Sequence, residues 1–268
     1  MKLPTIKSAI IAGGLALCAS SAYAGDALTV VSWGGAYTKS QIEAYHKPYT
    51  AKYGTKIQSE DYNGGLAEIR AQVEAGKITW DVVDLEVSDA ARGCDDGLFE
   101  KISAGSLPNG VNGALPSKDF IPGALQECAV GTIVWSTIYA YDADKYKSKK
   151  PTTISDFFDV KKFPGKRGMR KVPKVNLEWA LMADGVDGKD VYKVLATKAG
   201  QDRAFKKLDT IKNDVLWWEA GAQPPQMLAD GEVVMTSAYN GRIFNAAVTE
   251  KKNFEIVWDR QLFSFCLL

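Results

Sequence analysis

An alternation of apolar, strand-like runs with helix-like segments limits the folds that this chain can adopt. Leu28–Ser32, Lys56–Glu60 and Asp81–Leu85 have the composition of buried strands, and segments 38–52 and 65–74 between them have helical spacing. This strand–helix–strand–helix–strand order favours a parallel sheet with helices on its faces. The sequence therefore predicts an α/β protein.

A later run of strand-forming residues, Thr132–Tyr141, is longer than the usual strand of about 5–6 residues. Such a length is expected of a segment that crosses between two domains. The chain has 268 residues, 46% of them hydrophobic, which is enough for one large or two smaller domains. Length and composition leave these two possibilities open.

Residues 1–24 have the pattern of a secretory signal peptide. Lys2 and Lys7 form a basic start, residues 9–19 form an apolar run, and Ala22-Tyr23-Ala24 is a small-x-small cleavage site. The apolar run is too short to span a bilayer, which needs about 20 residues. The sequence therefore predicts a cleaved signal and a periplasmic location.

In an oxidising compartment, cysteines can form disulfides. Cys18 leaves with the signal, whereas Cys94 and Cys128 stay in the body of the chain and Cys266 lies near its end. We expect a Cys94–Cys128 disulfide; the alternative is a pair of buried thiols.

Composition and motifs argue against an enzyme, a metal centre and a nucleic-acid partner. The 33 basic and 32 acidic residues nearly balance, without the clustered basic face that nucleic acid requires. His46, the single histidine, has no evident partner and fits a surface helix. The sequence contains no Cys-x-x-Cys, no Gly-x-Ser-x-Gly and no phosphate-binding loop. No cofactor is expected.

Several segments, taken in order, resemble the solute-binding proteins of bacterial ABC importers, in the spermidine/putrescine-type branch. The segments are Ser32-Trp-Gly-Gly35, Trp80-Asp-Val-Val-Asp-Leu85, Lys162-Phe-Pro-Gly-Lys-Arg-Gly168, Leu228-Ala-Asp-Gly-Glu-Val-Val-Met235, Ala238-Tyr-Asn-Gly-Arg242 and Ile256-Val-Trp-Asp259. The resemblance implies a periplasmic binding protein of type II, with two α/β lobes joined by a hinge of crossing strands. On this basis we expect residues 26–136 and 240–268 to form one lobe and residues 137–239 to form the other. The resemblance also implies a monomer that closes on a small solute and delivers it to an inner-membrane ABC permease. It further implies another strand and several helices beyond residue 268, so we expect the chain to be truncated.

The first lobe offers candidate ligand contacts where its strands end. Trp33 follows the first strand, at the edge where open α/β sheets place ligands. Gly34 and Gly35 would let the backbone approach a bound group, and Tyr37 lies one helical step further. We predict that Trp33 is a stacking wall; the alternative is a tryptophan of the lobe core.

Glu86 and Ser88 follow the third strand and are candidate contacts at the same edge. The alternatives for them are a solvated turn and a helix cap.

The second lobe offers a matching set. Adjacent tryptophans in Trp217-Trp218 point to opposite faces of a strand, so one can be core and the other cleft. We assign Trp218 to the cleft, together with Gln223 before a helix and Tyr239 at the expected hinge. Arg242 is a further candidate; its alternative is an ion pair at the lobe edge.

The charged residues do not decide which class of solute the protein binds. Relatives that bind polyamines aim carboxylates at the amines, because a buried ammonium needs a paired charge. Here Arg170, Lys171 and Lys174 occupy a segment that supplies acids in polyamine binders, and Glu178 is the nearest acid.

The resemblance thus favours a polyamine of the spermidine/putrescine class. The alternative is a carboxylate-bearing zwitterion, such as γ-aminobutyrate or another amino acid, held by Arg242 together with Glu86 or Glu178. Ferric ion is a further alternative, since the chain has 11 tyrosines.

Overall fold

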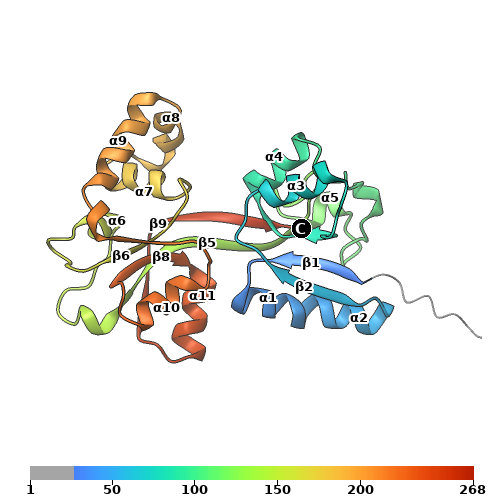
Figure 1. Ribbon diagram of the computed structural model, residues 1–268, viewed down its shortest axis with the longest axis horizontal. Helices are drawn as coiled ribbons and strands as arrows, with labels where there is room; N and C mark the ends of the chain where they lie inside the picture. The colour runs from blue at the N-terminus through green and yellow to red at the C-terminus, as the bar shows by residue number, and fades with distance from the viewer. Residues whose placement is uncertain (1–26) are drawn as a thin grey trace, which may run out of the picture.

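The computed structural model describes residues 27–268, which form two lobes joined by two long strands (Figure 1). The predicted signal peptide, residues 1–24, lies outside the described residues. Within the described part, no helix combines the length and the apolar character that a membrane crossing requires. The predicted arrangement of two α/β lobes with crossing strands is confirmed.

The first lobe contains a three-stranded parallel sheet in the order β2-β1-β3. Its elements are β1 (Leu28–Ser32), α1 (Gly35–Gln41), the π-helical turn η1 (Ile42–His46), α2 (Lys47–Tyr53), β2 (Ile57–Asp61), α3 (Ala67–Ala75), β3 (Val82–Val83), β4 (Leu85–Glu86), α4 (Val87–Asp95) and α5 (Pro116–Asp119). The predicted strand–helix–strand–helix–strand order is confirmed. The third predicted strand is split at Asp84, after which β4 joins the other sheet.

The second lobe is built on β8, β6 and β7 of a mixed six-stranded sheet, whose order β4-β9-β5-β8-β6-β7 continues through β5 and β9 to β4 in the first lobe. Its elements are β5 (Gly131–Asp142), α6 (Ile154–Phe158), β6 (Arg167–Arg170), α7 (Asn176–Ala183), α8 (Val191–Leu195), α9 (Lys198–Asp209), β7 (Val215–Trp218), α10 (Gln223–Ala229), β8 (Met235–Tyr239), α11 (Asn240–Phe244), the π-helical turn η6 (Asn245–Thr249) and β9 (Phe254–Leu267). Its core is aromatic, with Phe157, Phe163 and Trp179 fully buried.

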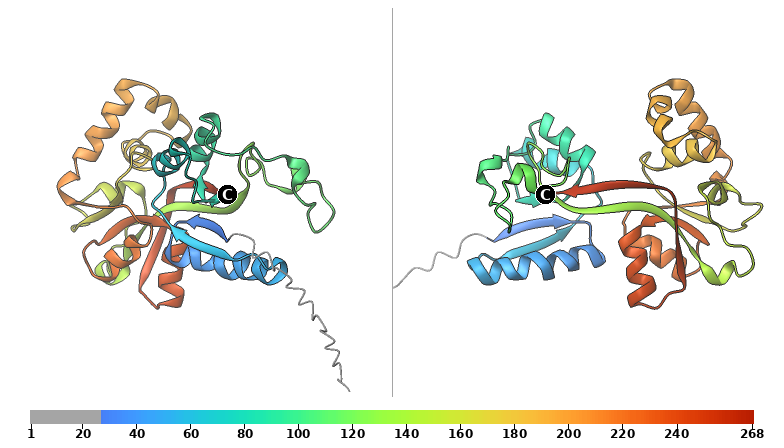
Figure 2. Two further views of the ribbon diagram at one scale, coloured as in Figure 1. Left: turned by 45° about the vertical axis from the view of Figure 1, so that its right-hand side comes forward. Right: turned by 180° about the vertical axis from the view of Figure 1, so that it is seen from behind.

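The antiparallel strands β5 and β9 run from one lobe into the other (Figure 2). Phe254 pairs with Asp142 in the second lobe, and Leu267 pairs with Gly131 in the first, where it also pairs with Leu85 of β4. The apolar segment 261–268 is thus largely strand, buried at Cys266 and Leu267.

The return crossing lies later in the chain than predicted. Residues 240–253 lie with the second lobe, where α11 lies beside α10 and buries Ile243 in the same core. The reason is the register, because β9 starts opposite Asp142, at the far end of β5. The chain after Tyr239 must first travel to that end of the lobe before it can cross back.

The disulfide between Cys94 and Cys128 is confirmed, with an S–S distance of 2.02 Å. It ties the end of α4 to the segment that leads into β5. Closing a loop of this length stabilises a fold by about 3–4 kcal/mol in the chain-entropy estimate. The first lobe, which has the smaller sheet, thereby gains a covalent link to the crossing strands. Cys266 is buried with a free thiol.

Candidate functional site

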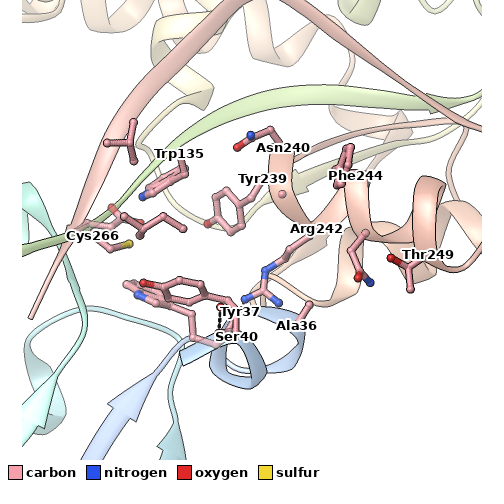
Figure 3. Close-up of a pocket in the computed structure, with 16 residues that line it drawn as sticks. Ala36, Tyr37, Ser40, Trp135, Tyr239, Asn240, Arg242, Phe244, Thr249 and Cys266 are labelled. Atoms are coloured by element: carbon pink, nitrogen blue, oxygen red, sulfur yellow. Dashed lines mark hydrogen bonds between the residues drawn. The ribbon is translucent and has the colours of Figure 1, made fainter. Parts of the chain in front are cut away.

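A cavity of about 370 Å³ lies between the lobes, beside the crossing strands (Figure 3). All three parts of the fold contribute to its walls. They include Trp33, Tyr37 and Glu86 from the first lobe, Trp135 and Cys266 from the crossing strands, and Tyr239, Arg242 and Phe244 from the second lobe. A cavity of this size, largely aromatic and with few charged groups, suits a small organic molecule.

A buried carboxylate fixes the aromatic wall of the first lobe. Asp84 is fully buried, and its oxygens accept hydrogen bonds from Trp33 Nε1 at 3.2 Å, Tyr37 Oη at 2.7 Å and Gln41 Nε2 at 2.7 Å. Burial raises the pKa of Asp84, although these donors act in the opposite direction. Burial and the charge of Asp84 raise the pKa of Tyr37. The Tyr37 phenol therefore stays protonated and keeps a fixed orientation.

Sequence reasoning gave no role to Asp84. The available signal was an acid between Val83 and Leu85, inside an otherwise apolar strand run. Because a buried carboxylate needs hydrogen-bond donors, an acid in such a run marks a position where polar side chains converge.

The Trp33 indole is packed on its faces. Its ring lies 5.1 Å from the Tyr62 ring, and a Cβ at Gly64 would come within 2.6 Å of it. The Arg170 guanidinium of the second lobe lies 5.7 Å from the Trp33 ring centroid. Trp33 thus borders the cavity while Arg170 takes the position above its ring.

Arg242 brings the second lobe against the first. Its Nη2 donates to the Trp33 carbonyl at 2.8 Å, and Arg242 as a whole residue is only 8% exposed. Gly35 and Gly221 make room for it, because a Cβ would lie 2.9 Å from Nη1 at Gly35 and 3.0 Å from Nε at Gly221. Burial lowers the pKa of Arg242. Among residues 27–268 no carboxylate forms an ion pair with it.

Tyr239 projects into the cavity between Trp135 and Arg242 (Figure 3). Its ring stands edge-on to Trp135 at 4.9 Å and to Trp218 at 5.8 Å. Within the described part of the chain, its hydroxyl has no hydrogen-bond partner. Burial raises the pKa of Tyr239, so the phenol remains a hydrogen-bond donor.

Glu86 reaches the cavity but is held by two cations of the second lobe. Arg170 Nη1 lies 2.6 Å from its Oε1, and Lys174 Nζ lies 2.8 Å from its Oε2. Burial alone would favour the protonated acid, but the attraction of Arg170 and Lys174 outweighs it and lowers the pKa of Glu86. Glu86 is therefore an anion whose charge is already balanced.

Four predicted contacts lie away from the cavity. Trp218 is 1% exposed and packs in the core behind Tyr239, because the core side of β7 takes the second tryptophan and leaves Trp217 exposed. Gln223 is exposed, and its Oε1 caps the preceding turn by accepting from the amides of Glu219 and Ala220.

Glu178 lines a separate hollow with Tyr192, whose hydroxyl donates to it at 3.5 Å. Its helix α7 packs against α6, α8 and α9. Ser88 is exposed, and it does not cap α4, which starts one residue earlier at Val87. Gly34 and Gly35 are not among the cavity's described lining residues. The Gly34 amide donates to Thr38 Oγ1 within the turn. Gly35, by contrast, faces Arg242.

The described residues do not provide a metal site. No group of three or more His, Cys, Asp and Glu side chains within residues 27–268 is arranged to hold a metal ion. Ferric ion favours tyrosinate, yet burial raises the pKa of both cavity tyrosines, Tyr37 and Tyr239. The arrangement suits an organic solute better than a hard cation.

Comparison with known sequences identifies the relatives of this chain. The profile of the bacterial extracellular solute-binding proteins matches residues 44–265. The gamma-aminobutyric acid-binding protein of Pseudomonas aeruginosa is 47% identical over 250 residues, which are 93% of this chain and 68% of that protein.

Solved structures show the same fold. The PBP MotA from A. tumefaciens B6, in complex with glucopine, is 30% identical, with a TM-score of 0.82 over 90% of this chain and 72% of that one. The Atu4243 GABA receptor is 32% identical, with a TM-score of 0.73 over 90% of this chain and 71% of the receptor.

The spermidine/putrescine branch is a more distant match. A putative spermidine/putrescine transporter protein from Listeria monocytogenes is 15% identical with a TM-score of 0.68, which shows a common fold alone. The expected family is thus correct, but the expected branch is not supported. The fold of this chain is periplasmic-binding-protein-like. The protein is the substrate-binding component of an ABC transporter, and the members of its family are solute-binding proteins rather than enzymes. With residues 44–265 matched and the two lobes meeting at one small cavity, the chain belongs to the bacterial extracellular solute-binding protein family.

Proposed function

We propose that this protein binds a small zwitterion that carries a carboxylate, of the γ-aminobutyrate type, in the cavity between its lobes. The observation that carries the proposal is the Arg242 guanidinium, which is buried at the cavity without an ion pair to any described residue. The bound solute would be delivered from the periplasm to an inner-membrane permease, and residues 1–24 would direct export.

A second buried arginine shows how unusual the surroundings of Arg242 are. Arg167 is fully buried, but backbone carbonyls accept from its guanidinium, including Phe157 O at 2.8 Å, Gly165 O at 2.6 Å and Phe163 O at 2.6 Å. Arg242 has one such bond, to Trp33. Since a guanidinium has five N–H donors, Arg242 keeps donors available for a ligand.

A carboxylate matches the Arg242 guanidinium in charge and in shape. The planar guanidinium binds carboxylates through two parallel hydrogen bonds, which are stronger than bonds between neutral groups. A buried charge without a partner is costly, so a ligand that brings the opposite charge removes that cost. Cationic solutes gain nothing from Arg242.

The ammonium end of a zwitterion would meet aromatic rings. Tyr37, Trp135 and Tyr239 line the cavity, and a cation over such a ring gains about 0.5–2 kcal/mol. The relatives agree with this chemistry, because gamma-aminobutyric acid is the ligand named for the Pseudomonas protein and for the Atu4243 receptor. These names support the zwitterion over the polyamine that the sequence resemblance favours.

Calorimetry with three ligands of one length tests the proposal. γ-Aminobutyrate, 4-aminobutanamide and putrescine share an ammonium and differ at the other end, which is an anion, a neutral amide or a second cation. We expect γ-aminobutyrate to bind roughly 10- to 100-fold tighter than the amide, as a charge-assisted contact of about 1.5–3 kcal/mol implies. Equal affinity for acid and amide, or tighter binding of putrescine, would overturn the proposal.

A further inference from the structure

Trp33 and Glu86 together have the chemistry of a site for an organic cation. An aromatic face attracts a cation, and a buried carboxylate beside it supplies the paired charge that a buried ammonium requires. The exposed fraction of the Glu86 side chain is 11%, so an ion bound there would be largely shielded from water. Glu86 is also the one carboxylate among the cavity's described lining residues.

This site is already filled by side chains of the protein itself. The Arg170 guanidinium lies 5.7 Å from the Trp33 ring centroid and 2.6 Å from Glu86 Oε1, and its Nη2 donates to the Asn63 carbonyl at 3.1 Å. Lys174 Nζ takes the other oxygen of Glu86 at 2.8 Å. Both cations come from the second lobe and enter the site across the cleft.

Neighbouring acids are engaged as well. Asp89, one turn beyond Glu86, pairs with Lys174 at 3.2 Å and with Arg92 at 2.8 Å. Two carboxylates therefore face three cations in this cluster, which leaves no uncompensated negative charge for a ligand's ammonium.

We propose that Arg170 and Lys174 are specificity-determining residues that occupy the cation position between Trp33 and Glu86 and thereby exclude polyamines. The inference rests on the proposed function, since excluding cations matters for a protein whose solute carries a carboxylate. A diamine can reach Glu86 only by displacing these side chains, and displacement leaves a buried guanidinium unpaired. A carboxylate at Arg242 displaces neither of them.

The alternative role for these ion pairs is purely structural, as a clasp between the lobes. The two roles differ in what removal of the cations does. If Arg170 and Lys174 only hold the lobes together, removing them weakens the binding of every ligand by a similar factor. If they occupy a cation position, removing them opens a site that polyamines can enter.

The double variant Arg170→Ala/Lys174→Ala distinguishes the two roles, using putrescine and spermidine as probes in calorimetry. We expect putrescine to bind at least about ten-fold tighter than to the wild-type protein, because Trp33 and Glu86 become available. The matched control is Lys171→Ala, which removes a cation of the same segment that pairs with Glu219 on the surface at 3.2 Å. This control should leave putrescine binding unchanged.

Adding Glu86→Gln to the double variant should abolish the gain, because the carboxylate that pairs with the ammonium is then absent. The inference is overturned if the folded double variant gains no polyamine affinity, or if the gain survives Glu86→Gln and so reflects net charge alone. Should the double variant not fold, Arg170→Gln/Lys174→Gln keeps hydrogen-bonding groups near Glu86 and is judged by the same gain. Wild-type binding of γ-aminobutyrate is measured separately, so failure of the proposed function and failure of this inference are distinguishable.

Discussion

The Arg242 guanidinium of the second lobe donates a hydrogen bond to the Trp33 carbonyl of the first lobe at 2.8 Å, across 209 positions of sequence. The bond forms only when the lobes approach each other. One side chain thus joins the lobes and faces the cavity, where it is available to a ligand.

Replacement of Arg242 should weaken carboxylate binding. We expect Arg242→Gln to reduce affinity for γ-aminobutyrate by roughly 10- to 100-fold, because a charged pair worth about 1.5–3 kcal/mol is lost. Arg242→Lys should lose less, since it keeps the charge but not the planar fork. The control is Arg203→Gln, because the Arg203 guanidinium pairs with Asp184 on the surface at 2.6 Å. Calorimetry measures the affinity of each variant for γ-aminobutyrate. An Arg242→Gln affinity within two-fold of wild type, a difference of roughly 0.4 kcal/mol, would contradict the prediction.

A methyl group at Gly35 should disturb binding through Arg242. Gly35 has φ of +60°, and a Cβ there would lie 2.9 Å from Arg242 Nη1. Gly54→Ala is a matched control, because Gly54 has φ of +75° and no atom within 4 Å of an added Cβ. Both variants should lose about 1 kcal/mol of unfolding free energy from backbone strain. Only Gly35→Ala should also weaken binding of γ-aminobutyrate, and equal binding by the two variants would argue against the predicted role of Arg242.

Loss of the Asp84 carboxylate should destabilise the first lobe strongly. Asp84→Ala leaves Trp33 Nε1, Tyr37 Oη and Gln41 Nε2 without their acceptor, at about 1–3 kcal/mol for each buried donor. We therefore expect a loss of at least about 3 kcal/mol in urea unfolding. Asp81→Ala removes an exposed carboxylate that accepts from Thr29 N, and it should cost less. Similar losses in the two variants would be inconsistent with the buried network.

The ion pairs of Glu86 should make stability depend on pH. The pKa of Glu86 is lowered from 4.5 in the folded protein, so its pairs contribute stability above that value. The contribution is lost as pH falls through the lowered folded value, where Arg170 and Lys174 lose their counter-charge. Thermal unfolding of wild type and Glu86→Gln between pH 7 and pH 3 measures this effect. The advantage of the wild type should shrink below pH 4.5, and a constant difference would speak against a charged Glu86.

Much of the fold could be predicted from local patterns. The first strands and helices, the long crossing strand and the disulfide follow from hydrophobic spacing and cysteine placement. Five predicted site residues also line the cavity, namely Trp33, Tyr37, Glu86, Tyr239 and Arg242. Trp33, Tyr37 and Glu86 could be identified because side chains that follow strand ends in an α/β lobe gather at one edge of the sheet. Tyr239 and Arg242 were identified through the family resemblance.

The order of the residues was thus sufficient to predict the α/β character, the two lobes and the sheet edge where candidate site residues gather. Packing between distant segments places Trp218 in the core and sets the return crossing in β9. It also pairs Glu86 with Arg170, 84 positions away. These features depend on contacts between residues that are distant in the sequence. Hydrophobic periodicity is a local signal, which indicates which face of a helix or strand is buried but not which partner covers that face. Charge pairing and burial across the cleft arise only once both lobes are in place.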